Sequence, residues 1–481
     1  TGKLRTFQET PSAREQLLKI PMLRREDLEK KARGFSNLEV VKDGVKLVRH
    51  EYPTNGIVYL TMYLDASVLR QEDFPYLGIL KNVLGEVDTE HYSYGDLANE
   101  INRRTGGVTP GITVLPSQED ASVVKAGFGI QIAALPDEVD FAMEIAAEIL
   151  LTSKIDDAKR LREILQEVKS RTLARLTSSG SSTAVTRALS GFSAEYLLSD
   201  SIGGIRFYDT VCEYVKQFDE KKDELTARLE EVLRRVIRKA GFLVSYTGDE
   251  SRAGAVLDKA AAISRRFPDT ELPAGQISGV IKPVQGLHFD VKKEGFKTPG
   301  KVQYVAQGGN YADAGLPCTG LLSVLRVIMN YDYLWTNLRV VGGAYGCGAS
   351  FARNGAAAFY SYRDPHLEHT LGVYRKITDY LKNFTADDRD MTKYVIGTIS
   401  DFDTPLTPKM AGSRSMSAYL TSLTQEELQR QRDQVLGATQ EDIRSLAPYI
   451  EAVLNKGAVC VVGSEEKIKQ AGKLFDTVRF L

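Results

Sequence analysis

The sequence contains little cysteine, and that scarcity excludes several classes of protein. Its 481 residues include four cysteines, which are widely separated and form no CxxC pair. They are Cys212, Cys318, Cys347 and Cys460. Disulfide-stapled secreted modules, zinc fingers and thioredoxin-like sites all need cysteines at closer, regular spacing. The thiols therefore suit a reducing compartment.

Long apolar runs and an excess of charge of one sign are also missing. No stretch reaches the roughly 18 apolar residues that a membrane helix needs, and the N-terminus is too polar for a signal peptide. The 62 Lys and Arg nearly balance the 63 Asp and Glu, so no overall field attracts nucleic acid or an anionic membrane. We expect a cytoplasmic protein that binds neither. Because the sequence opens on Thr1-Gly2 without Met, we also expect further sequence upstream.

Histidine is scarce, and its spacing does not match a metallopeptidase helix. The five histidines are His50, His91, His288, His366 and His369. None stands in an H-x-x-E-H pattern, in which two His one turn apart bind zinc and the Glu activates water. The segment His366-Leu367-Glu368-His369 is one residue too short. Two His three apart can bind a transition metal weakly, but they lie off the apolar stripe of their helix, which favours ordinary surface histidines. We predict no metal ligand in this chain.

The first half of the sequence has the pattern of an α+β unit. Segments 45–52 and 56–65 alternate apolar with polar residues around a Pro-Thr-Asn-Gly turn, which predicts two paired strands. Segments 75–87 and 137–150 have helical apolar spacing, and 242–250 reads as a closing strand.

The second half repeats this order. Strands are expected at 301–309 and 355–362, helices at 318–335 and 364–383, and a final strand at 458–466. The economical interpretation is two copies of one unit. We predict a helical linker segment at 1–35, a first domain at 36–265, a proline-containing linker at 266–300 and a second domain at 301–481.

The most informative stretch is 333–365, YLWTNLRVVGGAYGCGASFARNGAAAFYSYRDP. Arg339 and Tyr345 stand six residues apart around Gly342 and Gly343. A guanidinium and a phenol are donors suited to an oxyanion or to peptide carbonyls, and glycines let a backbone pass close to a ligand. Alternatively, Arg339 pairs with a carboxylate and Tyr345 packs in a turn. A phosphate loop is disfavoured, because no Lys-Ser/Thr at a helix start follows.

The 333–365 block resembles the C-terminal half of a presequence protease, in the pitrilysin/insulinase family of zinc metallopeptidases. The segment YSYGDLANEINRRTGG (92–107) is similar to a helix and Gly-Gly turn common in these domains. The resemblance implies two homologous α+β domains, each an antiparallel-rich sheet packed with helices, which together form one half of a clamshell. In the family's catalytic domain, the helix after the first strand pair carries the zinc motif. Here that helix, around 76–81, offers no metal ligand, so the first domain resembles a non-catalytic copy.

The resemblance also implies roles for single residues. Arg339 and Tyr345 would be catalytic, reaching across a closed chamber, and Gly342, Gly343, Tyr360 and Tyr362 would contact the substrate. Zinc would be bound by an N-terminal half of the same polypeptide, and the substrates would be unstructured oligopeptides. This chain alone would be inactive. Cys347 is interpreted as a small residue that fills the glycine-rich loop.

A second class stays open from the same residues. The chain could be a non-catalytic subunit of the family that binds peptides for a separate catalytic chain. An upstream H-x-x-E-H in the same polypeptide would favour the enzyme, and translation starting near Thr1 would favour the subunit.

Overall fold

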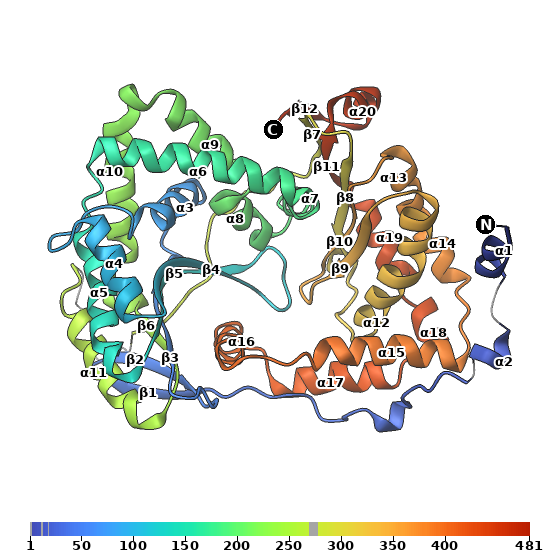
Figure 1. Ribbon diagram of the computed structural model, residues 1–481, viewed down its shortest axis with the longest axis horizontal. Helices are drawn as coiled ribbons and strands as arrows, with labels where there is room; N and C mark the ends of the chain where they lie inside the picture. The colour runs from blue at the N-terminus through green and yellow to red at the C-terminus, as the bar shows by residue number, and fades with distance from the viewer. Residues whose placement is uncertain (1, 11–12, 18, 269–277) are drawn as a thin grey trace.

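The computed structural model describes residues 2–10, 13–17, 19–268 and 278–481, which form two lobes (Figure 1). Each lobe is built on a six-stranded sheet. The strands of the first sheet are β1 (Leu38–Lys42), β2 (Val45–His50), β3 (Val58–Asp65), β4 (Gly107–Pro116), β5 (Val124–Ala134) and β6 (Leu243–Thr247). Those of the second are β7 (Lys293–Thr298), β8 (Gln303–Asn310), β9 (Gly346–Phe351), β10 (Ala356–Tyr362), β11 (Ala458–Ser464) and β12 (Thr477–Phe480).

The two sheets share one strand order, which confirms the predicted repeat. The first runs β1-β2-β6-β3-β5-β4 and the second β12-β7-β11-β8-β10-β9. In each, the late strand β6 or β11 pairs parallel to one neighbour and antiparallel to the other. Only the edge strands β1 and β12 differ in their place along the chain. Antiparallel pairs predominate in both sheets, as expected for the α+β class.

The predicted pairing of the first two long strands is wrong. β6 lies between β2 and β3, with Leu60 of β3 opposite Tyr246 and Leu47 of β2 opposite Val244. The turn signal at Pro53 to Gly56 is real, but the strand that fills the gap comes much later in the chain. All five residues of β6 are buried, so this strand is stabilised as the middle of the sheet.

The helices of the first lobe pack on its sheet and on one another (Figure 1). They are α3 (Phe74–Val83), α4 (Tyr94–Arg104), α5 (Val139–Thr152), α6 (Ala158–Ser178), α7 (Gly180–Leu189), α8 (Ala194–Gly203), α9 (Ile205–Lys216), α10 (Phe218–Val236) and α11 (Glu250–Ser264), with short 3-10 turns at Gln71–Asp73, Pro136–Glu138 and Lys239–Gly241. The predicted stripe of α5 is confirmed, because Val139, Met143 and Ile149 are all buried in the core. Ser93 caps α4 by accepting a hydrogen bond from Asp96 N at 3.2 Å.

Most helices of the second lobe pack on its sheet or on one another. Its helices are α12 (Leu321–Ile328), α13 (Glu368–Arg375), α14 (Ile377–Lys382), α15 (Asp388–Phe402), α16 (Pro408–Thr421), α17 (Gln425–Leu436), α18 (Gln440–Arg444), α19 (Ala447–Asn455) and α20 (Glu465–Gln470), with 3-10 turns at Tyr311–Ala314 and Gly472–Leu474. Leu367, Leu371 and Tyr374 are buried as their spacing predicts, although the expected single helix is broken between α13 and α14.

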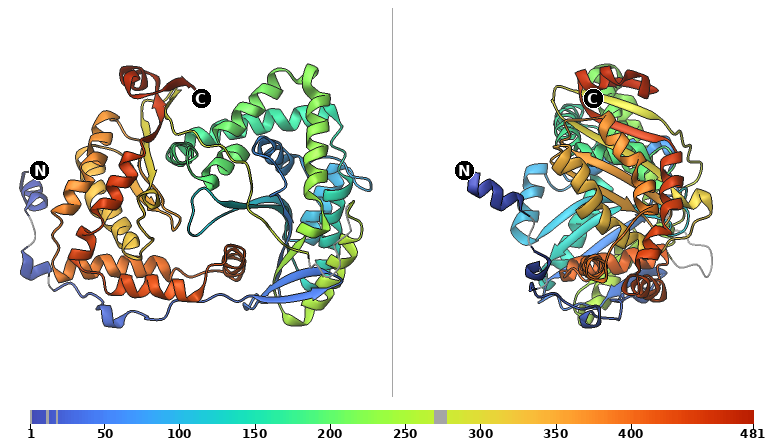
Figure 2. Two further views of the ribbon diagram at one scale, coloured as in Figure 1. Left: turned by 180° about the vertical axis from the view of Figure 1, so that it is seen from behind. Right: turned by 90° about the vertical axis from the view of Figure 1, so that its right-hand side faces the viewer.

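The N-terminal segment wraps the outside of the second lobe before it enters the first (Figures 1 and 2). It contains α1 (Gly2–Glu9), α2 (Arg14–Leu17) and a turn at Arg25–Asp27. Arg25 Nη1 donates to the carbonyls of Leu436 at 3.2 Å and Ala438 at 2.9 Å, and Arg432 Nε donates to Glu29 O at 2.7 Å. The N-terminal segment is therefore hydrogen-bonded to the second lobe.

Two helices cross between the lobes. α7 packs on β8, β10 and β11 of the second sheet, and α16 packs on β2, β4 and β6 of the first. Arg187 of α7 reinforces the first crossing, since it donates to Glu294 of β7 at 2.6 and 2.9 Å and to Asp200 of α8 at 2.8 Å. The lobes are thus joined through side chains as well as through the backbone.

The expected linker at 266–300 lies partly outside the described residues, because these resume at Ser278. Its last part contains β7, which pairs with β11 and β12. Among the helices described, none is long and apolar enough to cross a membrane.

Candidate active-site surface

The Arg339 segment follows α12 as two π-helical stretches, Met329–Tyr333 and Trp335–Val341. π-Helical turns are rare and often occur at functional sites. The second stretch ends at Val341, and Gly343, two residues later, has a φ of +77° in the left-handed region that favours glycine. Gly343 N donates to Arg339 O at 3.1 Å, so the turn leads directly from Arg339 towards Tyr345.

The structure brings Arg339 and Tyr345 together. Arg339 Nη1 donates to Tyr345 O at 2.6 Å, and its guanidinium lies 4.2 Å from the Trp335 ring centroid and 5.4 Å from that of Tyr345. Within the described chain, no carboxylate forms an ion pair with Arg339. This one hydrogen bond leaves other N–H donors of the five in the guanidinium for a ligand.

Tyr345 is held by its backbone and exposes its side chain. Its N–H donates to Tyr362 O at 3.1 Å, and its ring centroid lies 5.9 Å from that of Tyr362. The residue is 64% exposed. No hydrogen bond from its hydroxyl to another described residue is present, so the phenol is free to donate to a ligand.

The other predicted substrate residues all have a place in the local packing. Tyr360 and Tyr362 lie on one face of β10, half-buried against the apolar cluster under α7. Gly348 makes room for Tyr360, since a Cβ there would lie 2.5 Å from Tyr360 Oη. A Cβ on Gly342 would lie 2.7 Å from Leu338 O, so helix packing alone explains that glycine. Of the two strand tyrosines, Tyr362 is the one whose ring contacts Tyr345. Contact of these residues with substrate stays a prediction.

Exposed apolar side chains lie on the same helical segment as Arg339, and they were not predicted from the sequence. Tyr331 is 73% exposed, Val341 is 74% exposed, and Val340 and Trp335 are also exposed. The available signal was Val340 and Val341 directly after Arg339 in a helical run, which no helical apolar stripe explains. A patch of this kind on a protein surface marks an interaction site.

Comparisons with known proteins indicate which family the chain resembles. Residues 1–213 match the associated domain of M16 peptidases of subfamily C, and residues 293–465 match the PreP C-terminal domain. The chain is 34% identical to Protein HypA of Clostridium perfringens over 99% of its own length and 48% of the relative's. It is 28% identical to presequence protease 1, chloroplastic/mitochondrial, of Arabidopsis thaliana, over 98% of the chain and 43% of the relative.

The chain belongs to the M16 peptidase family, and it matches the C-terminal half of presequence proteases. It spans about half the length of the curated relatives named above. The resemblance carried by the 333–365 block is therefore confirmed.

Solved structures agree on the fold of this M16 half. A peptidase M16 inactive domain from Pseudomonas fluorescens superposes with a TM-score of 0.60 at 15% identity, covering 89% of the chain and 98% of that structure. A conserved protein from Enterococcus faecalis V583 has a TM-score of 0.62 at 12% identity, with 90% and 99% coverage.

The residues of this M16 half do not fit a zinc site. His366 and His369 lie at the exposed start of α13 with ring centroids 5.9 Å apart, and two ligands are too few for a protein zinc centre. Within the described residues there is no group of three or more His, Cys, Asp or Glu that could hold a metal.

Cys347 is not a nucleophile poised for catalysis. It lies in β9 rather than in the predicted loop, and burial raises the pKa of its thiol to about 11. The thiolate, which is the reactive form, is therefore scarce at neutral pH.

We expect Cys347 to react slowly with iodoacetamide at pH 8 in the folded chain and rapidly after unfolding in urea. Peptide mapping by mass spectrometry measures the modified fraction at Cys347 against time. Equal rates in the folded and unfolded chain would contradict the buried, protonated thiol.

Proposed function

We propose that this chain is the substrate-enclosing C-terminal half of a zinc metalloendopeptidase that degrades unstructured oligopeptides. One observation carries the proposal: Arg339 and Tyr345 lie side by side on an exposed surface, with donors free for a ligand, inside the block that matches presequence proteases. The N-terminal half of the same polypeptide would close over this surface as the other half of a clamshell.

The two side chains suit different parts of a bound peptide. The Tyr345 hydroxyl would donate to the oxyanion that develops at the scissile carbonyl, and the remaining N–H groups of Arg339 would hold neighbouring carbonyls or a terminal carboxylate. The carbonyl of Tyr345 already fixes the guanidinium, which reduces the entropy lost when a peptide binds. Closure of the two halves would complete the site.

The exposed apolar residues around Arg339 fit the proposed substrate class. Unfolded peptides present apolar side chains that folded proteins bury. Tyr331, Trp335 and Val341 would contact these peptide side chains and shield them from water. Half-buried Tyr362 extends this surface beside Tyr345.

Zinc would be bound outside this chain, where it would activate the attacking water. The chain alone should therefore hydrolyse no peptide, whereas the polypeptide that joins it to its N-terminal half should. A fluorogenic unstructured peptide, assayed with both proteins at equal concentration, tests this. Hydrolysis by the chain alone would contradict the proposal.

We expect the purified chain to retain no stoichiometric zinc after incubation with zinc and dialysis, because its histidines lack the spacing of a zinc site. Elemental analysis of the dialysed protein, with the dialysis buffer as control, measures the content. One tightly held zinc per chain would contradict the divided site.

A non-catalytic subunit that binds peptides for a separate catalytic chain is the second candidate. The Pseudomonas fluorescens neighbour favours it, because that structure is called an inactive domain and is matched over 98% of its length. This candidate predicts peptide binding without hydrolysis in every polypeptide that carries the chain. Localisation in the cytoplasm also stays a prediction, since the Arabidopsis relative is named chloroplastic/mitochondrial.

A further inference from the structure

A cavity of about 410 Å³ lies where both lobes and the N-terminal segment meet. Its walls come from the segment at 32–35, the β4–β5 and β9–β10 turns, the end of α15, and helices α16 and α17. The volume is in the range of small-molecule binding sites. Neither Arg339 nor Tyr345 lines it, since Tyr345 precedes β9 whereas Arg353, which lines the cavity, follows that strand.

Every charged residue that lines this cavity is an arginine. The four are Arg33, Arg353, Arg414 and Arg432, and the lining includes no Asp or Glu. Asp403, outside the lining, pairs with two of them: Arg432 at 2.8 Å and Arg33 at 3.9 Å. In the described chain no carboxylate forms an ion pair with Arg353 or Arg414.

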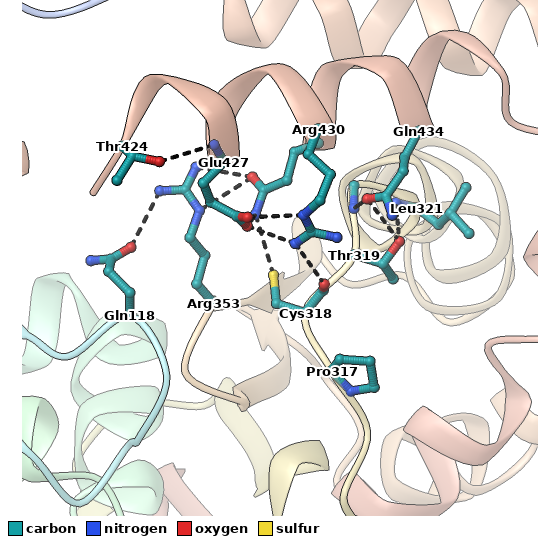
Figure 3. Close-up of polar contacts among 12 residues, drawn as sticks. Gln118, Pro317, Cys318, Thr319, Leu321, Arg353, Thr424, Glu427, Arg430 and Gln434 are labelled. Carbon is teal, nitrogen blue, oxygen red and sulfur yellow. Dashed lines mark hydrogen bonds and ion pairs between the residues drawn. The ribbon is translucent and has the colours of Figure 1, made fainter. Parts of the chain in front are cut away.

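Arg353 is held by neutral amides (Figure 3). Its Nε and Nη2 donate to Gln431 Oε1 at 3.2 and 3.0 Å, and its Nη1 donates to Gln118 Oε1 at 3.3 Å. Glu427 is nearby, but Arg430 already binds both of its carboxylate oxygens, at 2.7 and 2.9 Å. The charge of Arg353 is thus placed without a dedicated counter-ion.

Arg414 is likewise hydrogen-bonded to neutral acceptors. Its Nη1 and Nη2 donate to the carbonyls of Gly34 and Arg33, each at 3.1 Å, and its guanidinium lies 4.6 Å from the Phe35 ring centroid. Burial lowers the pKa of Arg353 and of Arg414 and outweighs the charges that raise them, from Cys318 and Glu427 on Arg353 and from Tyr52 on Arg414. The charges of Arg353 and Arg33 also lower the pKa of Arg414. Two like charges that are partly desolvated and repel each other would be stabilised by an anion between them.

The rest of the lining is largely apolar. It includes Ala32, Phe35, Phe402, Ala418, Leu423 and Leu428. Inorganic anions gain nothing from such a surface, whereas a ligand with an apolar body gains roughly 25 cal/mol for each Å² that it buries.

We propose that this cavity binds a small organic carboxylate that carries an apolar group. The carboxylate would lie between the Arg353 and Arg414 guanidiniums, whose planar forks match it, and the apolar group would contact Phe35 and Leu428. A free carboxylic acid and the C-terminal residue of a peptide share this chemistry. Because the walls come from both lobes and from the N-terminal segment, the ligand would join three parts of the fold. The proposal does not depend on the proposed peptidase function.

Isothermal titration calorimetry of the whole chain with N-acetyl-L-phenylalanine tests the site. N-acetyl-L-phenylalanine amide keeps the apolar group and lacks the charge, and inorganic phosphate has charge without the apolar group. We expect the acid to bind at least about tenfold more tightly than either. Acetyl-Ala-Ala-Phe distinguishes the two sources, since binding as tight as that of the single residue indicates a peptide terminus and exclusion indicates a free acid.

Arg353→Gln and Arg414→Gln should each weaken binding of the acid at least about tenfold, because a neutral amide cannot replace a charged fork. Arg326→Gln is the matched control, since Arg326 forms an exposed ion pair with Asp401 at 2.7 Å and does not line the cavity. Circular dichroism verifies folding of each variant. Equal binding of acid and amide, equal binding of phosphate, no binding up to about 10 mM, or wild-type affinity in both cavity variants would overturn the proposal.

Discussion

Tyr345→Phe, made in the polypeptide that joins this chain to its N-terminal half, is expected to lower kcat by ~10²–10³ with a smaller change in KM. The variant keeps the ring that contacts Tyr362 and removes only the exposed hydroxyl. If that hydroxyl donates mainly to the oxyanion of the transition state, its loss slows the chemical step more than it weakens binding. Steady-state hydrolysis of an unstructured fluorogenic peptide measures both constants.

Tyr94→Phe is the matched control for this prediction. Tyr94 is also an exposed tyrosine, but it lies on α4 of the first lobe, beside Arg160. The kcat of Tyr94→Phe should stay within about twofold of the wild type, because an exposed hydroxyl outside the active site contributes little to turnover. Near-normal turnover by Tyr345→Phe would remove the catalytic role. A large loss of thermal stability in that variant would instead support a structural one.

Arg339→Lys tests the second proposed donor in the same assay. A lysine ammonium cannot donate to Tyr345 O and span two substrate acceptors at once, and it lacks the flat face that lies over Trp335. We therefore expect turnover well below that of the wild type at unchanged thermal stability. Full activity would show that a point charge is enough.

Arg187→Met is expected to lower the free energy of unfolding by ~3–5 kcal/mol, the largest effect on stability that we predict. The Asp200 and Glu294 side chains are both almost fully buried, and Arg187 is their shared ion-pair partner. Burial would lower the pKa of Arg187, but hydrogen bonds and charge from Glu294 and Asp200 raise it instead. Methionine fills similar volume and leaves two buried carboxylates unpaired.

Urea denaturation followed by circular dichroism measures this loss. Arg326→Met is the control, because its exposed ion pair with Asp401 should contribute less than about 1 kcal/mol. A loss in Arg187→Met no larger than in the control would show that water or a repacked neighbour replaces the guanidinium.

Local patterns in the sequence predicted the elements better than the contacts between them. The stripes of α5 and α13 follow directly from helical spacing, and their buried residues agree. β2 and β3 were paired wrongly because the strand that separates them, β6, is remote in the chain. The length of an apolar run says nothing about which distant strand will lie beside it.

The two candidate sites differ in the same way: one is formed by residues close together in the sequence, and the other by residues far apart. Arg339 and Tyr345 are six residues apart and joined by one turn, so a local motif is enough to bring them together. Arg353 instead meets Gln118 and Gln431, which are 235 and 78 residues away. The glycine neighbours of Cys347 predict a loop, because glycine favours turns, yet cross-strand pairing with Ser361 places Cys347 in β9.

Single-turnover kinetics, with the zinc content measured on the same samples, tests our main proposal, that Tyr345 of this half acts on a transition state formed at a zinc site in the other half. We expect Tyr345→Phe to lower the single-turnover rate by ~10²–10³ while one zinc per polypeptide is retained. An unchanged rate at full zinc content, or a loss of rate that follows a loss of zinc, would contradict it.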